Sequence, residues 1–435
     1  MRFKDILGID FFLLLPVIVL MVLGVLFIYS SGITSDGDLV STEYIRQIVW
    51  ASSGLLIALV VSFVNYRRFY EIALYLYLFI LVPLLYTCIF GRVVHGTRWL
   101  RIGIFGIQAS EFAKIAVIIF LARYLSDTRL GKNSFIRFIT ACLIVFIPMG
   151  IVLVQPDLGT ALVFIPILLS MTFVAGISMR YLIFSISCIS LTGVLAVLPF
   201  WQTYILRRSL PIITALTNLR LMIIVVLALG IIFAIALFGF LKYRKRYFFW
   251  MLYVDAIMVF SFCASYAVRM VLKSYQIMRL IVFLDPNVDP RGAGWHIIQS
   301  VTAIGAGGLS GQGYLLGTQS HYRFLPEQST DFIFSIFSEE MGFIGGIAVF
   351  ALFLLICLRL LRLTKLVTDP FAAYICAGLV GVFSFHFIIN VGMTMGIMPI
   401  TGIPLLFMSY GGSSLMSAMS GIGLALSIHV RRYNH

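Results

Sequence analysis

One acidic residue, Asp331, has neighbours that suit a carboxylate with a chemical role. It follows Ser329 and Thr330 and precedes an apolar run that starts at Phe332. Ser and Thr are favoured N-cap residues, so the sequence predicts that Ser329 or Thr330 caps a helix and that Asp331 lies in its first turn. The positive end of that helix would keep the carboxylate ionised, as a general base requires. An aspartate that only complements the helix dipole would occupy the same position.

Further polar side chains lie within or next to apolar runs, where burial is costly and a functional role is the first hypothesis. Glu111 and Lys114 are three residues apart, so they share a helix face, and we expect them to form a buried pair that lines a central cavity. Gln155 and Asp157 interrupt another apolar run, and Asp157 is expected at a helix start.

Two more pairs lie deeper in the C-terminal third of the chain. Glu339 and Glu340 follow Asp331 inside the same apolar run, and a structural role would require pairing with an arginine that the sequence does not identify. His386 and Asn390 are four residues apart, which favours a satisfied hydrogen bond between helices over a metal site.

Several other chemistries find no support in the sequence. The six cysteines lie inside apolar runs and are interpreted as small hydrophobic residues. No His, Cys and carboxylate set has metal-ligand spacing, and no Gly-x-Ser-x-Gly motif occurs. The glycines between Gly305 and Gly317 fit neither a dinucleotide fingerprint nor a P-loop, and instead permit tight turns and close backbone approach. No nucleic-acid partner is expected.

The elements that must position these residues are membrane helices. Of the 435 residues, 61% are hydrophobic and only 11% are charged, which excludes a soluble domain, a disordered chain and a disulfide scaffold. A span needs about 20 apolar residues. We therefore predict an all-α polytopic membrane protein with about twelve spans, centred on 11–30, 47–64, 70–90, 108–125, 137–154, 158–175, 181–200, 221–241, 248–271, 332–358, 371–392 and 405–428.

The distribution of cations predicts the orientation. With both termini cytoplasmic, the inner segments hold more Lys and Arg than the outer ones, and the cluster Lys242–Arg246 fixes one inner turn. The outer segments 91–107 and 273–330 still hold many cations. These are explained equally well by side chains that anchor the protein at the interface and by an anionic substrate at the outer face.

Residues 273–330 form the longest predicted non-spanning segment, an extracytoplasmic loop before the helix that starts near Asp331. Loops of this length are usually functional or disordered, and its interleaved apolar residues argue against disorder. Asp285 and Asp289 each precede a proline and are predicted first as turn formers.

Five segments together resemble the SEDS family. They are Arg98-Trp99-Leu100, Gln108–Lys114, Gln155–Thr160, nearly all of 275–345, and Pro404–Ser413 with its Ser409-Tyr410-Gly411-Gly412-Ser413. The resemblance spans both ends of the chain and is most specific in 275–345. The stretches His296–Ser300 and Gly317–Ser320 are similar to the cell-elongation branch of the family rather than to its division branch.

The resemblance implies a peptidoglycan glycosyltransferase that polymerises lipid II into nascent glycan at the outer face of the cytoplasmic membrane. Its implied partner is a single-pass class B penicillin-binding protein, and Asp331, in a Thr-Asp-Phe motif, is the implied catalytic residue. Members of the family commonly have ten spans, so 221–272 is interpreted as an inserted helical pair, expected to be peripheral and to contribute no catalytic group. Ala109 also replaces a more usual proline.

This reaction needs a base near the attacking sugar hydroxyl and cations for the lipid pyrophosphate. Arg98, Arg279 and Lys114 are the candidate cations. No cofactor is required, although a divalent cation could accompany the pyrophosphate. The complete set of predicted substrate-binding residues is Arg98, Glu111, Lys114, Gln155, Asp157, Gln276, Arg279, Gln299, Ser300, Gln319 and Glu327.

Two other functions fit the composition. A flippase or transporter of the lipid-linked precursor would place its site near the midplane, often between inverted repeats, and no repeat is found here. A non-catalytic scaffold would not need Asp331. The concentration of polar motifs in one outer segment favours the glycosyltransferase.

Overall fold

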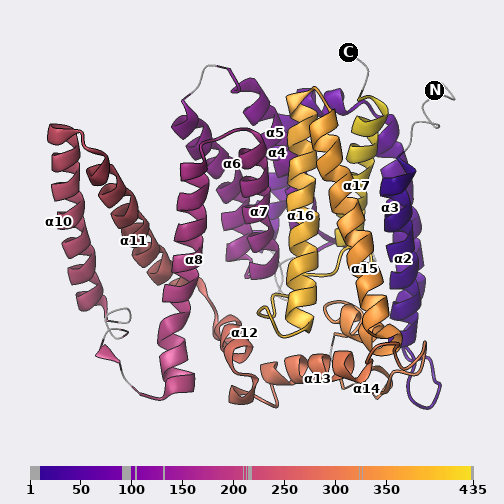
Figure 1. Ribbon diagram of the computed structural model, residues 1–435. Helices are drawn as coiled ribbons and strands as arrows, with labels where there is room; N and C mark the ends of the chain where they lie inside the picture. Colours follow the sequence, from indigo (N-terminus) through magenta and orange to yellow (C-terminus); the bar gives the residue numbers. More distant parts are fainter. Residues whose placement is uncertain are drawn as a thin grey trace. The chain divides into compact units, whose positions relative to one another are not determined.

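The computed structural model describes residues 10–90, 99–102, 105–130, 133–208, 210, 211, 213, 218–322, 324, 325 and 327–432. The chain is nearly all helical and divides into two compact units. One unit comprises residues 1–177 and 296–435, and the other comprises residues 178–295. Figure 1 shows the elements of both.

The first unit is a bundle of long helices with short elements across one end (Figure 1). Its helices are α2 (Phe11–Ser31), α3 (Glu43–Phe63), α4 (Tyr66–Phe90), α5 (Ala109–Asp127), α6 (Ser134–Val154), α7 (Leu158–Val174), α13 (Ala293–Ala306, which begins in the other unit), α14 (Thr318–His321), α15 (Ile333–Leu366), α16 (Pro370–Thr394) and α17 (Gly412–Val430). A short antiparallel hairpin, β1 (Trp99–Ile102) and β2 (Phe105–Gln108), precedes α5, with Trp99 opposite Gln108. This hairpin was not predicted from the sequence.

The second unit contains α8 (Met179–Trp201), a π-helical turn (Gln202–Leu206), α10 (Leu219–Tyr243), α11 (Arg246–Val271), α12 (Ser274–Leu284) and the 3₁₀ turn Pro286–Val288. Helix α11 packs between α8 and α10. Only 6% of the residues in the most apolar stretch of α10 are buried by the rest of the chain, so most of its side chains are left exposed. The predicted inserted pair thus corresponds to α10 and α11.

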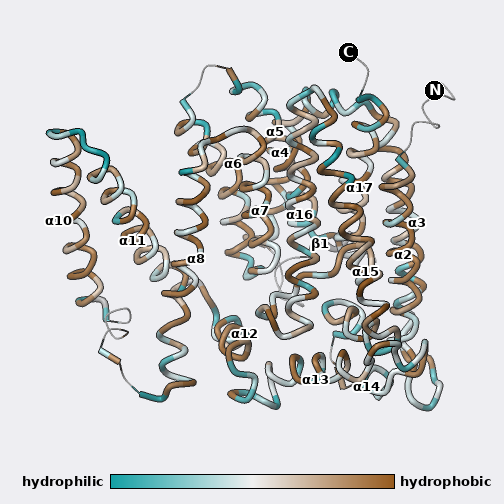
Figure 2. The backbone as a smooth tube through the Cα atoms, viewed as in Figure 1, coloured by the Kyte–Doolittle hydropathy of each residue, from teal (hydrophilic) through white to brown (hydrophobic). Residues whose placement is uncertain are grey.

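A helix lies at each of the twelve predicted spans. Among the described residues, ten helices are long and apolar enough to cross a membrane. The other two predicted spans are α5, which carries several charges, and α7, which has 17 residues. Figure 2 shows hydrophobic residues along the long helices and hydrophilic residues gathered near their ends. In lipid every backbone group must be satisfied internally, so apolar runs of this length form helices.

Helices α16 and α17 are the most buried of the candidate spans in the first unit. In their most apolar stretches, 61% and 72% of the residues are buried. Small residues allow such helices to pack closely against their neighbours. A Cβ atom at Gly423 of α17 would lie 2.7 Å from the carbonyl oxygen of Ala58 in α3. Glycine at this position therefore allows the two backbones to approach each other.

The first described residue and the end of the last helix lie together. Oδ2 of Asp10 is 3.3 Å from Nδ1 of His429, near the end of α17, and Oδ1 is 2.6 Å from Nη2 of Arg359 near the end of α15. In Figure 1, α13 and α14 lie at the opposite end of this unit. Asp10 and the end of α17 therefore lie at the same end of this unit.

Candidate active site

Asp331 lies in a turn formed by residues 327–331, the Asp331 turn, immediately before α15. The backbone nitrogens of Asp331 and Phe332 donate to the carbonyl oxygen of Glu327 over 3.2 and 3.4 Å. Helix α15 has Phe332 as its N-cap, so the prediction that Ser329 or Thr330 caps this helix with Asp331 in its first turn is wrong. The hydroxyl of Thr330 donates instead to the carbonyl oxygen of Glu327 over 3.3 Å, inside the turn.

Residues distant in sequence hold this turn in place. The backbone nitrogen of Tyr410 donates to the carbonyl oxygen of Ser329 over 2.8 Å. The hydroxyl of Ser329 donates to Oε2 of Glu43, at the start of α3, over 2.6 Å. Nε2 of Gln328 donates to the carbonyl oxygen of Ser320 in α14 over 3.1 Å. Contacts to three separate segments therefore hold the turn in place.

Asp331 and Phe332 are each fixed by a further helix. Nδ2 of Asn390, in α16, donates to the carbonyl oxygen of Asp331 over 3.0 Å. The buried ring of Phe332 stacks on the ring of His296 in α13, with centroids 5.9 Å apart. Asp331 itself remains partly exposed. Because Asp331 precedes the N-cap, the helix dipole supports its charge less than the sequence predicts. The hydrogen bonds that fix its backbone are then the main feature of this position.

Glu339, in α15, fixes the short helix α14. Its carboxylate accepts from the backbone nitrogens of Gln319 and Ser320 over 2.7 and 3.1 Å, and from the hydroxyl of Thr318 over 3.3 Å. Such charge-assisted bonds to orphan helix nitrogens are strong. Glu339 is fully buried, so it anchors the segment that contains the predicted site residue Gln319.

Glu340 fixes the preceding part of the same segment. Its Oε2 accepts from the backbone nitrogen of Leu315 over 3.0 Å, and Oε1 accepts from the hydroxyl of Ser30. Nε2 of His321 lies 3.9 Å from Oε1. In the described part of the chain neither Glu339 nor Glu340 pairs with an arginine, so the arginine pairing considered from the sequence is not found.

The glycine-rich segment packs against a kink in α15. Gly342 has φ +66° and ψ −164°, and a Cβ atom there would lie 2.3 Å from the backbone nitrogen of Gly311. Gly311 has φ +82°, and its own Cβ would lie 2.1 Å from the carbonyl oxygen of Glu340. Glycine is required on both sides of this contact, as the prediction of close backbone approach implies.

Tyr314 attaches the glycine-rich segment to α2. Its hydroxyl donates to the carbonyl oxygen of Leu26 over 3.0 Å. Burial, together with the nearby Glu340 carboxylate, raises the pKa of the Tyr314 hydroxyl. The group therefore stays protonated, and able to donate this bond, at neutral pH.

The predicted pair Glu111 and Lys114 is present and buried. Nζ of Lys114 lies 2.8 Å from Oε2 of Glu111, and the two side chains are 2% and 4% exposed. The same Nζ lies 3.1 Å from Nε2 of His386, whose Nδ1 is 3.0 Å from the carbonyl oxygen of Pro404. The expected pairing is confirmed, while the burial leaves little room for substrate at Lys114 unless the pair opens.

Gln155 and Asp157 make structural hydrogen bonds. Nε2 of Gln155 donates to the carbonyl oxygen of Leu84 over 2.7 Å. Asp157 is the N-cap of α7, where it accepts from the backbone nitrogen of Thr160 over 3.2 Å, which confirms its predicted helix start. It also accepts from Nε2 of Gln108 over 2.8 Å. Both side chains are buried, and their predicted contact with substrate stays a prediction.

The remaining predicted site residues differ in their surroundings. In the first unit, the hydroxyl of Ser300 donates to the carbonyl oxygen of Thr394 over 2.6 Å. Gln299 is partly exposed on α13. The carbonyl oxygen of Glu327 accepts the hydrogen bonds of the Asp331 turn. In the second unit, Gln276 caps the start of α12 and the guanidinium of Arg279 lies over the ring of Tyr275. Arg98 lies outside the described residues. Asp285 and Asp289 accept backbone hydrogen bonds within tight turns, as predicted.

No group of His, Cys, Asp and Glu side chains suited to a metal ion occurs among the described residues.

Three residues that hold the Asp331 turn were not predicted as site residues: Asn390, Tyr410 and Glu43. For Asn390 the signal was present, because its spacing from His386 predicts a polar contact. Its partners are backbone carbonyl oxygens, which cannot be identified from a sequence because every residue has one.

The chain is similar to known proteins over almost its whole length. The sequence profile of the FtsW/RodA/SpoVE cell cycle protein family matches residues 11–218 and 210–434. The chain is 48% identical over 435 residues to the peptidoglycan glycosyltransferase RodA of Treponema pallidum, covering 99% of this chain and all of that protein. It is 33% identical to the peptidoglycan glycosyltransferase MrdB of Escherichia coli K12, covering 99% of this chain and 96% of that one.

A solved structure described as a peptidoglycan synthase complex that coordinates polymerization and crosslinking contains a similar chain. The TM-score is 0.67, with 26% identity and coverage of 98% of this chain and 99% of that chain. The profile match, the two full-length relatives and the shared fold show that this multi-pass membrane protein belongs to the SEDS family, the FtsW/RodA/SpoVE cell cycle proteins.

Proposed function

We propose that the chain is a peptidoglycan glycosyltransferase that polymerises lipid II into glycan strands at the outer face of the cytoplasmic membrane. The observation that carries this proposal is the Asp331 turn, in which a partly exposed aspartate lies on a backbone held by Asn390, Tyr410 and Glu43. Full-length relatives named as peptidoglycan glycosyltransferases support it.

In this reaction a sugar hydroxyl attacks an anomeric carbon that carries a lipid pyrophosphate. Asp331 accepts the proton of the hydroxyl, a contribution typically worth about 10²–10⁴-fold in rate. Pyrophosphate is a good leaving group, so the reaction does not need a second carboxylic acid of the glycosidase type. Arg98 and Arg279 are the proposed pyrophosphate contacts, and a divalent cation could share that role.

The buried Lys114 has a different proposed role. Its charge is balanced by Glu111, and His386 links the pair to the segment at Pro404. We assign it to the electrostatic support of the site, with direct contact to substrate only when the pair opens.

The proposed partner is a single-pass class B penicillin-binding protein, which would crosslink the strands that this chain polymerises. The similar chain of known structure belongs to a synthase complex that coordinates polymerization and crosslinking, which supports a partner of this kind. A role in elongation and cell shape is supported by the similarity to RodA. The proposed orientation places Asp10 and the end of α17 in the cytoplasm and Asp331 outside.

A lipid II flippase is the alternative function. The deciding experiment incubates the purified protein and its penicillin-binding protein with lipid II, and in parallel measures lipid II movement across sealed vesicles. The proposal predicts long glycan strands and no protein-dependent transport. Transport without polymerisation would reject the glycosyltransferase function.

A further inference from the structure

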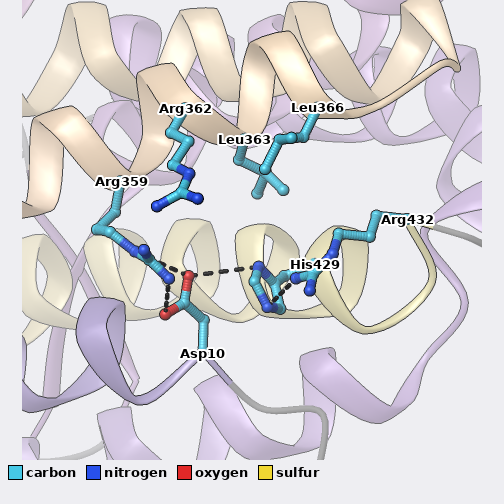
Figure 3. Close-up of a pocket in the computed structure, with 7 residues that line it drawn as sticks. All are labelled: Asp10, Arg359, Arg362, Leu363, Leu366, His429 and Arg432. Carbon is cyan, nitrogen blue, oxygen red and sulfur yellow. Dashed lines mark hydrogen bonds and ion pairs between the residues drawn. The ribbon is translucent and has the colours of Figure 1, made fainter.

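A basic pocket lies at the end of the first unit where α2 begins and α17 ends. Its volume is about 150 Å³, and it is lined by three arginines, one histidine, one aspartate and two leucines from α15, α17 and the residues beside them (Figure 3). Its position on α15 is 26 residues beyond Ile333, on the order of 40 Å along the helix from the Asp331 turn. It is therefore separate from the proposed active site.

Among the described residues, Asp10 is the one carboxylate that lines this pocket, and it already makes two ion pairs. Oδ1 of Asp10 lies 2.6 Å from Nη2 of Arg359, and Oδ2 lies 3.3 Å from Nδ1 of His429. With a neutral histidine, three arginines and one aspartate leave a net formal charge of +2 in the lining. Arg362 is exposed and makes no ion pair with any residue in the described part of the chain. Figure 3 shows Arg362 reaching from α15 towards the space beside Asp10 and His429.

The pocket borders an apolar surface suited to acyl chains. Phe12, two residues after Asp10, is 67% exposed, and the guanidinium of Arg359 lies 5.1 Å from the centre of its ring. Leu366, which lines the pocket, is 44% exposed, and Leu358, two turns earlier on α15, is 51% exposed. A ligand with an anionic head and apolar tails would satisfy both regions at once.

We propose that this pocket binds the phosphate of an anionic phospholipid. Arginine suits phosphate oxygens because its planar donors can bind two of them together. A free phosphate ion would use the same donors, but only a lipid also covers the exposed apolar side chains beside them. Basic pockets between membrane helices at the cytoplasmic side commonly bind anionic headgroups, and the proposed orientation places this pocket there.

The test is native mass spectrometry of the purified full-length protein with phosphatidylglycerol, compared with phosphatidylcholine. The variant Arg362→Gln removes a guanidinium that makes no ion pair with the described residues, and it leaves the Asp10 contacts in place. Lys365→Gln is the matched control, because it removes one cation from the same helix outside the pocket lining. We expect wild type and Lys365→Gln to retain phosphatidylglycerol over phosphatidylcholine, and Arg362→Gln to lose that retention by at least about tenfold. Arg362→Lys should restore it in part.

Equal retention of phosphatidylglycerol by Arg362→Gln and Lys365→Gln would overturn the proposal, as would equal retention of the two lipids by wild type. A third arm adds inorganic phosphate in excess. Phosphate that binds wild type while phosphatidylglycerol does not would reject a lipid as the occupant. The readout is lipid retention, so it does not depend on the polymerase activity.

Discussion

The side-chain nitrogen of Asn390 donates a hydrogen bond to the backbone carbonyl oxygen of Asp331 over 3.0 Å, across 59 residues of sequence. The same nitrogen donates to the carbonyl oxygen of Ile403 over 2.8 Å, and Asn390 is fully buried. One turn earlier on α16, His386 contacts both Lys114 and Pro404. A single face of α16 therefore connects the Asp331 turn with the Glu111–Lys114 pair.

Replacing Asn390 by Leu should lower the polymerisation rate by about 10²-fold, because a displacement near 1 Å of a catalytic group has an effect of that size. The maximal rate should fall more than the apparent affinity for lipid II, since the bond positions Asp331 and does not touch substrate. Ser384→Ala on the same helix is the control, because among the described residues that hydroxyl bonds only to carbonyl oxygens of its own helix. Wild-type kinetics for Asn390→Leu would rule out the positioning role.

Gly342→Ala should destabilise the fold and reduce activity. Its φ of +66° is unfavourable for alanine, and the new Cβ would clash with Gly311 and with the carbonyl oxygen of Leu309. Strain of this kind typically costs about 1–3 kcal/mol before the clash is counted. Gly346→Ala is the matched control, since its Cβ would meet only Phe334 at 3.8 Å. Thermal unfolding in detergent should show a lower midpoint for Gly342→Ala alone.

The helices are the part of this molecule that could be predicted from the sequence. Each apolar run long enough to cross lipid forms a helix, because no other structure satisfies its backbone there. The boundaries follow less directly from hydropathy. The predicted span 405–428 begins too early, since α17 starts at Gly412, and residues 405–411 instead supply Tyr410, which binds the Asp331 turn.

Details of the site could not be predicted, because its decisive bonds link distant segments. Ser329 and Thr330 are residue types that favour helix N-caps, but the Ser329 hydroxyl bonds to Glu43 at the start of α3 and the Thr330 hydroxyl bonds to Glu327 within the preceding turn. Glu339 is satisfied by backbone nitrogens of α14. A sequence search for a charged partner would miss such donors.

Neutralising one member of the Glu111–Lys114 pair should damage the protein more than neutralising both. A single change leaves a buried charge without its partner, which typically costs about 3–5 kcal/mol. The test compares Glu111→Gln, Lys114→Gln and the double variant for stability and polymerisation. If the double variant regains stability but stays as inactive as the worse single variant, Lys114 contacts substrate directly and the supporting role proposed here is wrong.

Asp255→Asn should leave polymerisation unchanged. Asp255 is in α11 of the second unit, and its Oδ2 is buried without a hydrogen-bond partner among the described residues. Removing its charge should keep or slightly raise the thermal stability, because an amide is less costly to bury than a carboxylate. A folded Asp255→Asn variant that cannot polymerise lipid II would contradict the prediction that α10 and α11 contribute no catalytic group.

Asp331→Asn should lower the polymerisation rate by at least about 10²-fold with near-normal folding and partner binding, because the amide keeps the shape of the carboxylate but cannot accept the proton. The turn itself should persist, since its hydrogen bonds use the backbone of Asp331. Asp36→Asn is the control, as Asp36 is exposed in the connection between α2 and α3. Strand length and rate should be measured at equal levels of protein and penicillin-binding protein. Wild-type glycan synthesis by Asp331→Asn would remove Asp331 from the mechanism, and an equal loss in Asp36→Asn would show that the assay reports a general effect of charge.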